Sequence, residues 1–225
     1  MKVLIAEETM TREPRLVIGY AVINDISVNK AEKPLKKEVL EVVNSVRDKY
    51  PSRIEMYVAN AIKGMRDLFK RNGTDPSKYA PSAEALLKRI IDGKDLYRIN
   101  NVVEGNNMGS MKFELPMGVY NMDNLTGDVV FQFGTNSEVM ETMAKGGMNM
   151  ENTLLTRDDE KPFGSPVSDS PRAMIAGNTK NVLLLVYGTS DVGEEYVAQA
   201  TEYTAKKIIE HAGGSIGELE VISSE

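Results

Sequence analysis

A nearly uninterrupted apolar run, residues 181–187, places the strongest limit on what this chain can fold into. It reads Asn-Val-Leu-Leu-Leu-Val-Tyr. Successive side chains of a strand point to opposite faces, so such a run must be buried on both faces, and it predicts a central strand. Further strands are expected at residues 2–6, 15–24, 127–134 and 153–157, and an edge strand at residues 219–222.

Segments with helical periodicity lie between these strands. Residues 34–50 carry one apolar face, and residues 51–71 predict a second helix with Ile54 and Val58 turned inward. Because strands and helices mix without a regular alternation, the pattern favours an α+β fold.

The last helix and the domain organisation follow from similar signals. Asp191 with Glu194 resembles a capping box, which predicts a long helix that ends at Gly213. The chain has no linker, repeat or low-complexity tract, so we expect a single domain over residues 1–225. Two strands and a helical pair form its first part, to about residue 80, and the main core runs from about 81 to 225.

Composition excludes several classes of protein. The chain has no cysteine and one histidine, His211, so neither a disulfide framework nor the usual metal clusters are expected, and we predict no metal and no cofactor. A net charge of −6 is unlike that of proteins that wrap nucleic acid, and no DNA partner is expected. No apolar run is long enough to cross a membrane, and the start has no secretory signal, so we expect no membrane contact and a cytoplasmic location.

One basic cluster stands apart from this acidic balance. Lys63, Arg66 and Lys70 follow one another at helical intervals. They are either a solvated helix face or a contact for an RNA backbone.

An asparagine-rich stretch, residues 81–125, is where we place the functional site. It opens with a predicted helix that begins near Pro81 and ends at Gly93. If residues 99–107 are helical, Asn100, Glu104 and Asn107 share one face. Such a face either binds a ligand or holds the helix to a neighbouring loop through a polar network.

Two other groups complete the candidate site. Gly118 lets a backbone approach a ligand closely, although a tight bend before a strand explains the same pattern. Asp169 is suited to hold an amino group or orient a water, and an Asx-type turn is the structural alternative. The candidate substrate-binding residues are Asn100, Glu104, Gly118, Tyr120, Asn121, Ser168, Ser170, Arg172 and Thr179, and the candidate catalytic residues are Asp169 and Asn107.

Several motifs in order carry a resemblance to a known family. They are PSAEALLKRI at residues 81–90, INNVVEGNN at 99–107, LPMGVYNMDNLTGDVVF at 115–131, Ser-Asp-Ser at 168–170 and NTKNVLL at 178–184. Together they resemble the B3/B4 module of the phenylalanyl-tRNA synthetase β subunit, and most closely free-standing proteins built from that module. The resemblance implies a three-layer β/β/α arrangement with mixed and antiparallel sheets.

The resemblance also implies an activity. In the synthetase the module is an editing site that hydrolyses the ester of tyrosine wrongly attached to the phenylalanine tRNA. Two positions differ: where the synthetase has a histidine and a glutamate in the pocket, this chain has Gly118 and Leu185. Tyrosine specificity is therefore not carried over.

The function expected from these observations is hydrolysis of a mischarged aminoacyl-tRNA ester in trans. An aminoacyl ester is already activated, so orientation and a positioned water can suffice without a serine or cysteine nucleophile. The expected partner is the aminoacylated 3′ end of a tRNA or a free amino acid. The sequence is also compatible with assembly into a homo-oligomer. The alternatives are a non-catalytic module that binds RNA or an amino acid or regulates a synthetase, and a hydrolase of a small ester unrelated to tRNA.

Overall fold

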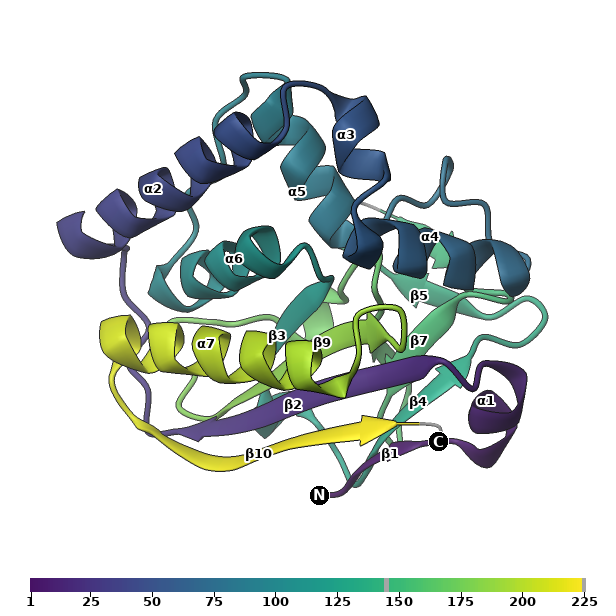
Figure 1. Ribbon diagram of the computed structural model, residues 1–225. Coiled ribbons are helices and arrows are strands. Elements are labelled where there is room, and N and C mark those ends of the chain that lie inside the picture. The colour runs from purple at the N-terminus through teal and green to yellow at the C-terminus, as the bar shows by residue number, and fades with distance from the viewer. Residues whose placement is uncertain (144–145, 224–225) are drawn as a thin grey trace.

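Two four-stranded sheets stack face to face in the computed structural model, which describes residues 1–143 and 146–223 (Figure 1). We call the sheet that lies between the other sheet and the helices the inner sheet. Its strands are β2 (Leu16–Asn24), β3 (Met117–Asn121), β9 (Val182–Thr189) and β10 (Ser215–Ser223). Their order is β10-β2-β9-β3, with every neighbouring pair antiparallel.

The second sheet, the outer sheet, is shorter and mixed. Its strands are β1 (Val3–Ile5), β4 (Val129–Phe133), β7 (Leu154–Arg157) and β8 (Pro162–Gly164). In the order β1-β4-β7-β8, β1 runs parallel to β4 and the other pairs are antiparallel. A separate hairpin consists of β5 (Val139–Glu141) and β6 (Gly147–Asn149).

Both faces of the inner sheet are buried along β9, and the alternation of side chains along this strand divides two cores. Leu183, Leu185 and Tyr187 face the outer sheet and belong to the core between the two sheets. The intervening Val182, Leu184 and Val186 face the helices. Because a strand with two buried faces needs apolar residues at every position, the run at residues 181–187 forms the strand between β2 and β3, as the sequence predicts.

Two helices cover the inner sheet on the side away from the outer sheet: α6 (Asn101–Phe113) and α7 (Glu194–Ala212) (Figure 1). They pack unusually close at Gly109, where a Cβ atom would lie 2.0 Å from Oγ1 of Thr204. Glycine is a poor residue for a helix interior, but here it allows the two helix backbones to approach each other. This close contact fixes α6 above β3.

The remaining helices lie in different parts of the fold (Figure 1). They are α1 (Glu7–Arg12), α2 (Lys33–Lys49), α3 (Arg53–Tyr57), α4 (Asn60–Arg71) and α5 (Ser82–Ile91), with short 3-10 helices η1 (Met122–Asn124) and η2 (Pro171–Ala173). A third core joins α2 and α5 to α6 through Leu35, Leu87 and Met108, among others. None of the helices in the described part of the chain has the length and apolar character that crossing a membrane requires.

The α+β architecture with two sheets and a helical layer is confirmed, and two details of the prediction are wrong. Residues 51–71 form two helices, because Ala59 is extended (φ −62°, ψ 133°). Ile54 and Val58, expected inward, are exposed as a result. The last helix begins at Glu194 after Gly193, since the Asp191 carboxylate does not cap it but accepts a hydrogen bond from Thr189 Oγ1 at 3.0 Å.

Candidate ligand-binding cavity

A cavity of about 620 Å³ opens between α5, α6, β3 and the segment after β8. This volume is in the range of sites that enclose small ligands. Its walls are largely apolar, with Leu86 from α5, Val103 from α6 and Val119 from β3. The few polar groups among them are therefore the ones that can orient a ligand.

Asp169 and Tyr120 form the polar group at the deep end of this cavity. The Tyr120 hydroxyl donates a hydrogen bond to Oδ1 of Asp169 at 2.6 Å. Burial raises the pKa of Asp169 to about 6, because the surrounding protein removes water from the charged form, while the hydrogen bond from Tyr120 acts in the opposite direction. Asp169 is thus mostly ionised at neutral pH and yet close enough to its pKa to accept a proton.

Two glycines make room for Tyr120. Its hydroxyl oxygen would lie 2.2 Å from a Cβ atom at Gly118 and 2.3 Å from one at Gly164. The Tyr120 ring packs edge-on against Phe163, with 4.8 Å between the ring centroids. Burial, followed by the nearby Asp169 charge, raises the pKa of Tyr120 well above its ordinary value, so Tyr120 stays protonated and remains a donor.

Asn106 is the most unusual polar residue of the cavity wall. Its side chain is buried, and its Oδ1 atom has no hydrogen-bond partner among the residues that the structure describes. An unpaired buried acceptor costs stability, so such an atom at a cavity surface points to a donor supplied by a ligand. Asn107, on the next position of α6, also lines the cavity.

The asparagines that precede them in the chain have structural tasks. Asn100 accepts a hydrogen bond from the Val103 amide at 2.9 Å and so caps α6. Asn101 donates to the carbonyl oxygens of Ser27 and His211. The sequence therefore concentrates asparagines here for two reasons: the first two hold the start of α6 in place, and the next two face the cavity.

Comparison with known proteins places this region in a family. The family model described as B3/4 domain matches residues 64–213. The chain belongs to the B3/4 domain family. All residues that line the cavity lie within this matched segment.

A solved structure shares the fold of this B3/4 domain. It is the crystal structure of an N-terminal fragment of the phenylalanyl-tRNA synthetase β subunit from Pyrococcus horikoshii, with a TM-score of 0.51 and 15% sequence identity. The match covers 96% of this chain and 50% of that chain, so this chain spans about half the length of the fragment. No curated protein sequence matches significantly. The resemblance seen in the sequence is confirmed, and the structural likeness concerns the fold alone.

Of the predicted site residues, the B3/4 domain brings Asn107, Tyr120, Asp169 and Ser170 together around the cavity. The others lie outside its lining. Their contacts are structural. Asn121 accepts a hydrogen bond from the Asp123 amide, and Thr179 accepts one from the Ala176 amide. Ser168 and Ser165 are hydrogen-bonded to each other.

The two charged residues of this set form ion pairs: Glu104 pairs with Arg98, and Arg172 pairs with Asp158. Gly118 faces the Tyr120 hydroxyl, and Asn100 caps α6. The roles proposed for all of these residues stay predictions.

The predicted RNA-binding residues on α4 all have acidic partners. Arg66 donates to both carboxylate oxygens of the buried Glu84, at 2.9 and 3.0 Å. Lys63 and Lys70 both pair with Asp67 at 3.2 Å. Much of the positive charge expected to attract RNA is therefore compensated within the protein, and RNA binding by this face stays a prediction.

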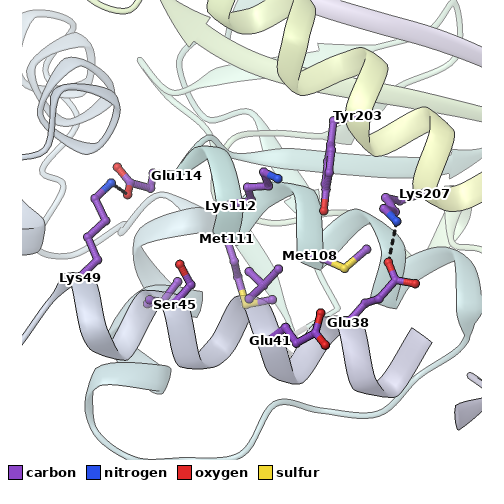
Figure 2. Close-up of a pocket in the computed structure, with 12 residues that line it drawn as sticks. Glu38, Glu41, Ser45, Lys49, Met108, Met111, Lys112, Glu114, Tyr203 and Lys207 are labelled. Carbon is purple, nitrogen blue, oxygen red and sulfur yellow. Dashed lines mark hydrogen bonds and ion pairs between the residues drawn. The ribbon is translucent and has the colours of Figure 1, made fainter. Parts of the chain in front are cut away.

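A second hollow of the B3/4 domain is a groove of about 460 Å³ between α2, α6 and α7, which we call the charged groove (Figure 2). Met108 and Met111 lie along it. Lys49 pairs with Glu114 at one end, and Lys207 pairs with Glu38 at the other. The charges at the two ends of this groove are thus paired with each other.

Among the described residues, one group has the ligand types that could hold a metal: Glu38, Glu210 and His211, with ligand atoms within 4.8 Å of one another. Lys207 donates to Glu38 at 2.6 Å and to Glu210 at 2.7 Å. The ammonium group already neutralises these carboxylates, so the group is accounted for as an ion-pair network.

Four further residues that line the cavity were not among the predicted site residues: Arg89, Tyr97, Met143 and Met174. Asn106 was grouped with Asn100, Glu104 and Asn107 but was given no role of its own. Asn106 lay in the asparagine-rich stretch that drew attention to the region. The other four come from α5 and from loops whose course the sequence pattern does not indicate.

Proposed function

We propose that this B3/4 domain hydrolyses, in trans, the ester bond of a mischarged aminoacyl-tRNA. The observation that carries the proposal is the Asp169–Tyr120 pair at the deep end of an apolar cavity within the family's matched segment. The aminoacyl group occupies the cavity, and its ester bond lies near the Asp169 carboxylate. The amino acid and the tRNA are left open.

The proposed reaction needs one base and one donor. Asp169 accepts a proton from a water molecule as the water oxygen attacks the ester carbonyl carbon. The bond between that carbon and the ribose oxygen then breaks, and the ribose oxygen takes the proton from Asp169 to become a hydroxyl group, which restores the carboxylate. The side-chain amide of Asn107 stabilises the negative charge that develops on the carbonyl oxygen. Tyr120 holds the Asp169 carboxylate in position.

The test is a deacylation screen with total tRNA charged separately with each amino acid. We expect selective ester loss for one amino acid, and Asp169→Asn should lower the rate at least about a hundredfold, the usual contribution of a general base. Asp123→Asn, an exposed aspartate outside the cavity, serves as the matched control. Wild-type rates in Asp169→Asn would remove Asp169 from the mechanism.

The pH dependence offers a second test of the same mechanism. Because burial raises the pKa of Asp169 to about 6, the base is protonated and inactive below that pH. The rate should therefore rise as pH increases through about 6, after correction for spontaneous hydrolysis. A rate that falls over the same interval would contradict a base at this position.

A second candidate function is binding of tRNA or an amino acid without hydrolysis. The observation in its favour is that Gly118 and Leu185, which replace a histidine and a glutamate of the synthetase, are paired across β3 and β9. Neither side chain can transfer a proton. Binding of an amino acid or a charged tRNA with no ester loss above the spontaneous rate would favour this alternative.

A further inference from the structure

The mouth of the cavity carries large apolar side chains that are exposed to solvent. Tyr97, Ile99, Met143 and Met174 all line the cavity, with exposed fractions of 69%, 56%, 56% and 47%. At the deep end, Tyr120 is 1% exposed. An exposed apolar cluster at the rim of a cavity is a common mark of a binding surface. The cavity therefore has an apolar mouth and a polar deep end.

Tyr97 is held in place by a cation. The guanidinium carbon of Arg89 lies 4.1 Å from the centroid of the Tyr97 ring, and Nη1 of Arg89 donates to the Tyr97 hydroxyl at 3.3 Å. Arg89 is itself fixed by a hydrogen bond from its Nε to the backbone oxygen of Asp95. The ring and the guanidinium therefore form one ordered platform, although Tyr97 lies in a loop.

The charge of Arg89 distinguishes it from the basic residues on α4. Lys63, Arg66 and Lys70 pair with carboxylates. Within the residues that the structure describes, Arg89 contacts a carbonyl oxygen, a hydroxyl and an aromatic ring, and forms no ion pair. An arginine whose charge is not compensated is the better candidate for a phosphate contact.

We propose that Tyr97 and Arg89 form the platform for the terminal nucleotide of the acylated RNA. The base stacks on the exposed Tyr97 ring, the Arg89 guanidinium contacts the phosphate, and the acyl group extends to Asp169 and Asn106 at the deep end. Aromatic rings bind unpaired bases of any sequence in this way. The inference rests on the proposed function, because the deep end is assigned to the aminoacyl group.

The order of the two subsites follows from their chemistry. A base offers a large flat apolar surface, which suits the exposed aromatic and methionine side chains of the mouth. The aminoacyl group carries N–H donors, which suit the unpaired Oδ1 atom of Asn106 and the Asp169 carboxylate. A reversed order would bury the nucleotide phosphate beside the Asp169 charge.

The experiment compares two substrates that carry the same acyl group: the charged tRNA and the methyl ester of the amino acid. We expect Tyr97→Ala to lower kcat/KM for the charged tRNA about tenfold or more, as loss of one base–aromatic stack does, and to leave the methyl ester within about twofold. Tyr97→Trp should retain the tRNA rate. Tyr79→Ala is the control, since Tyr79 also lies beside a cation, Lys78, but does not line the cavity.

Equal losses on both substrates, or no loss on the tRNA, would overturn the platform. A binding measurement keeps this outcome separate from failure of the proposed function. The anisotropy of a labelled single-stranded oligonucleotide with the tRNA 3′ terminal sequence is recorded for the wild type, Tyr97→Ala and Arg89→Gln. Weakening of about tenfold in Tyr97→Ala, and a smaller salt dependence in Arg89→Gln, support the platform even where no ester is hydrolysed. Equal affinities in all three proteins reject it.

Discussion

The cavity beside β3 and the charged groove lie on different faces of the same helix, α6, and they differ in how their polar groups are partnered. In the groove, Glu114 is bound by Lys49 and by the Tyr50 hydroxyl, and Glu38 is bound by Lys207. In the cavity, the Oδ1 atom of Asn106 has no hydrogen-bond partner within residues 1–143 and 146–223. Asp169 keeps a raised pKa despite its hydrogen bond from Tyr120.

The partnered groups of the groove serve the stability of the fold, whereas the polar groups of the cavity are available to a ligand. Buried polar groups that are partnered add to the stability of the native state, whereas those left without partners reduce it. A protein tolerates the second kind where a ligand completes the interaction, and binding sites are often less stable than the rest of the molecule for this reason. Substitutions in the two regions should therefore change the free energy of unfolding with opposite signs.

The largest effect is expected in the charged groove. Glu114→Ala leaves the buried Tyr50 hydroxyl without an acceptor and Lys49 without its partner. We expect the free energy of unfolding to fall by about 3 kcal/mol, as measured by urea denaturation. Glu41→Ala is the control in the same groove, because Glu41 pairs with the exposed Lys37, and its cost should stay below about 0.5 kcal/mol. Equal costs for the two variants would remove the distinction between buried and exposed pairs.

Asp169→Asn should change the free energy of unfolding in the opposite direction, by raising it. Because the pKa of Asp169 is about 6 in the folded protein and 3.8 ordinarily, its stabilising contribution is complete below about pH 3.8 and is lost as pH rises through about 6. Asparagine never ionises, so the variant should be more stable above pH 6 by up to about 3 kcal/mol and should show no such gain near pH 3.5. Thermal unfolding at both pH values measures the difference. A variant less stable than the wild type at pH 8 would place the ionised carboxylate among the stabilising groups.

A smaller increase in the free energy of unfolding is expected for a substitution of Asn106. Asn106→Leu replaces an unpaired acceptor by an apolar group of similar size, which should raise the free energy of unfolding by about 1 kcal/mol. The same change removes the acceptor offered to a ligand, so the measurement combines unfolding with binding of the substrate. A loss of stability would indicate that the amide has a structural task in α6.

The smallest effect is expected at Lys207. Lys207→Met removes ion pairs with Glu38 and Glu210 that are partly open to water, and should cost about 1 kcal/mol or less. The cost should shrink further at 1 M salt, which screens exposed charges. A large cost that is insensitive to salt would contradict the view that this end of the groove is held by surface electrostatics.

Local patterns in the sequence predicted much of the fold. The run at 181–187 indicated the central strand because burial on both faces leaves a signal in adjacent residues. Residues 51–71 were mispredicted because the apolar period continues across a break at Ala59 that depends on backbone conformation. The resemblance of five ordered motifs supplied the three-layer arrangement, which periodicity alone does not give.

The site was harder to predict than the fold. Asn107, Tyr120 and Asp169 lie around one cavity, but the sequence does not distinguish Asn106, which faces the cavity, from Asn100, which caps α6. The distinction depends on where α6 starts and how it packs on β3. Likewise, the basic period on α4 gives no sign that Glu84, on another helix, lies opposite Arg66.

The space between Gly118 and Gly164 has a consequence for how this protein can evolve. The Tyr120 hydroxyl would lie 2.2 Å from a side-chain carbon at Gly118 and 2.3 Å from one at Gly164, so Tyr120 keeps its present position only with a glycine on both sides. A side chain at either glycine would displace the Tyr120 hydroxyl and disturb its hydrogen bond to Asp169. These positions are therefore expected to change together during evolution and not one at a time.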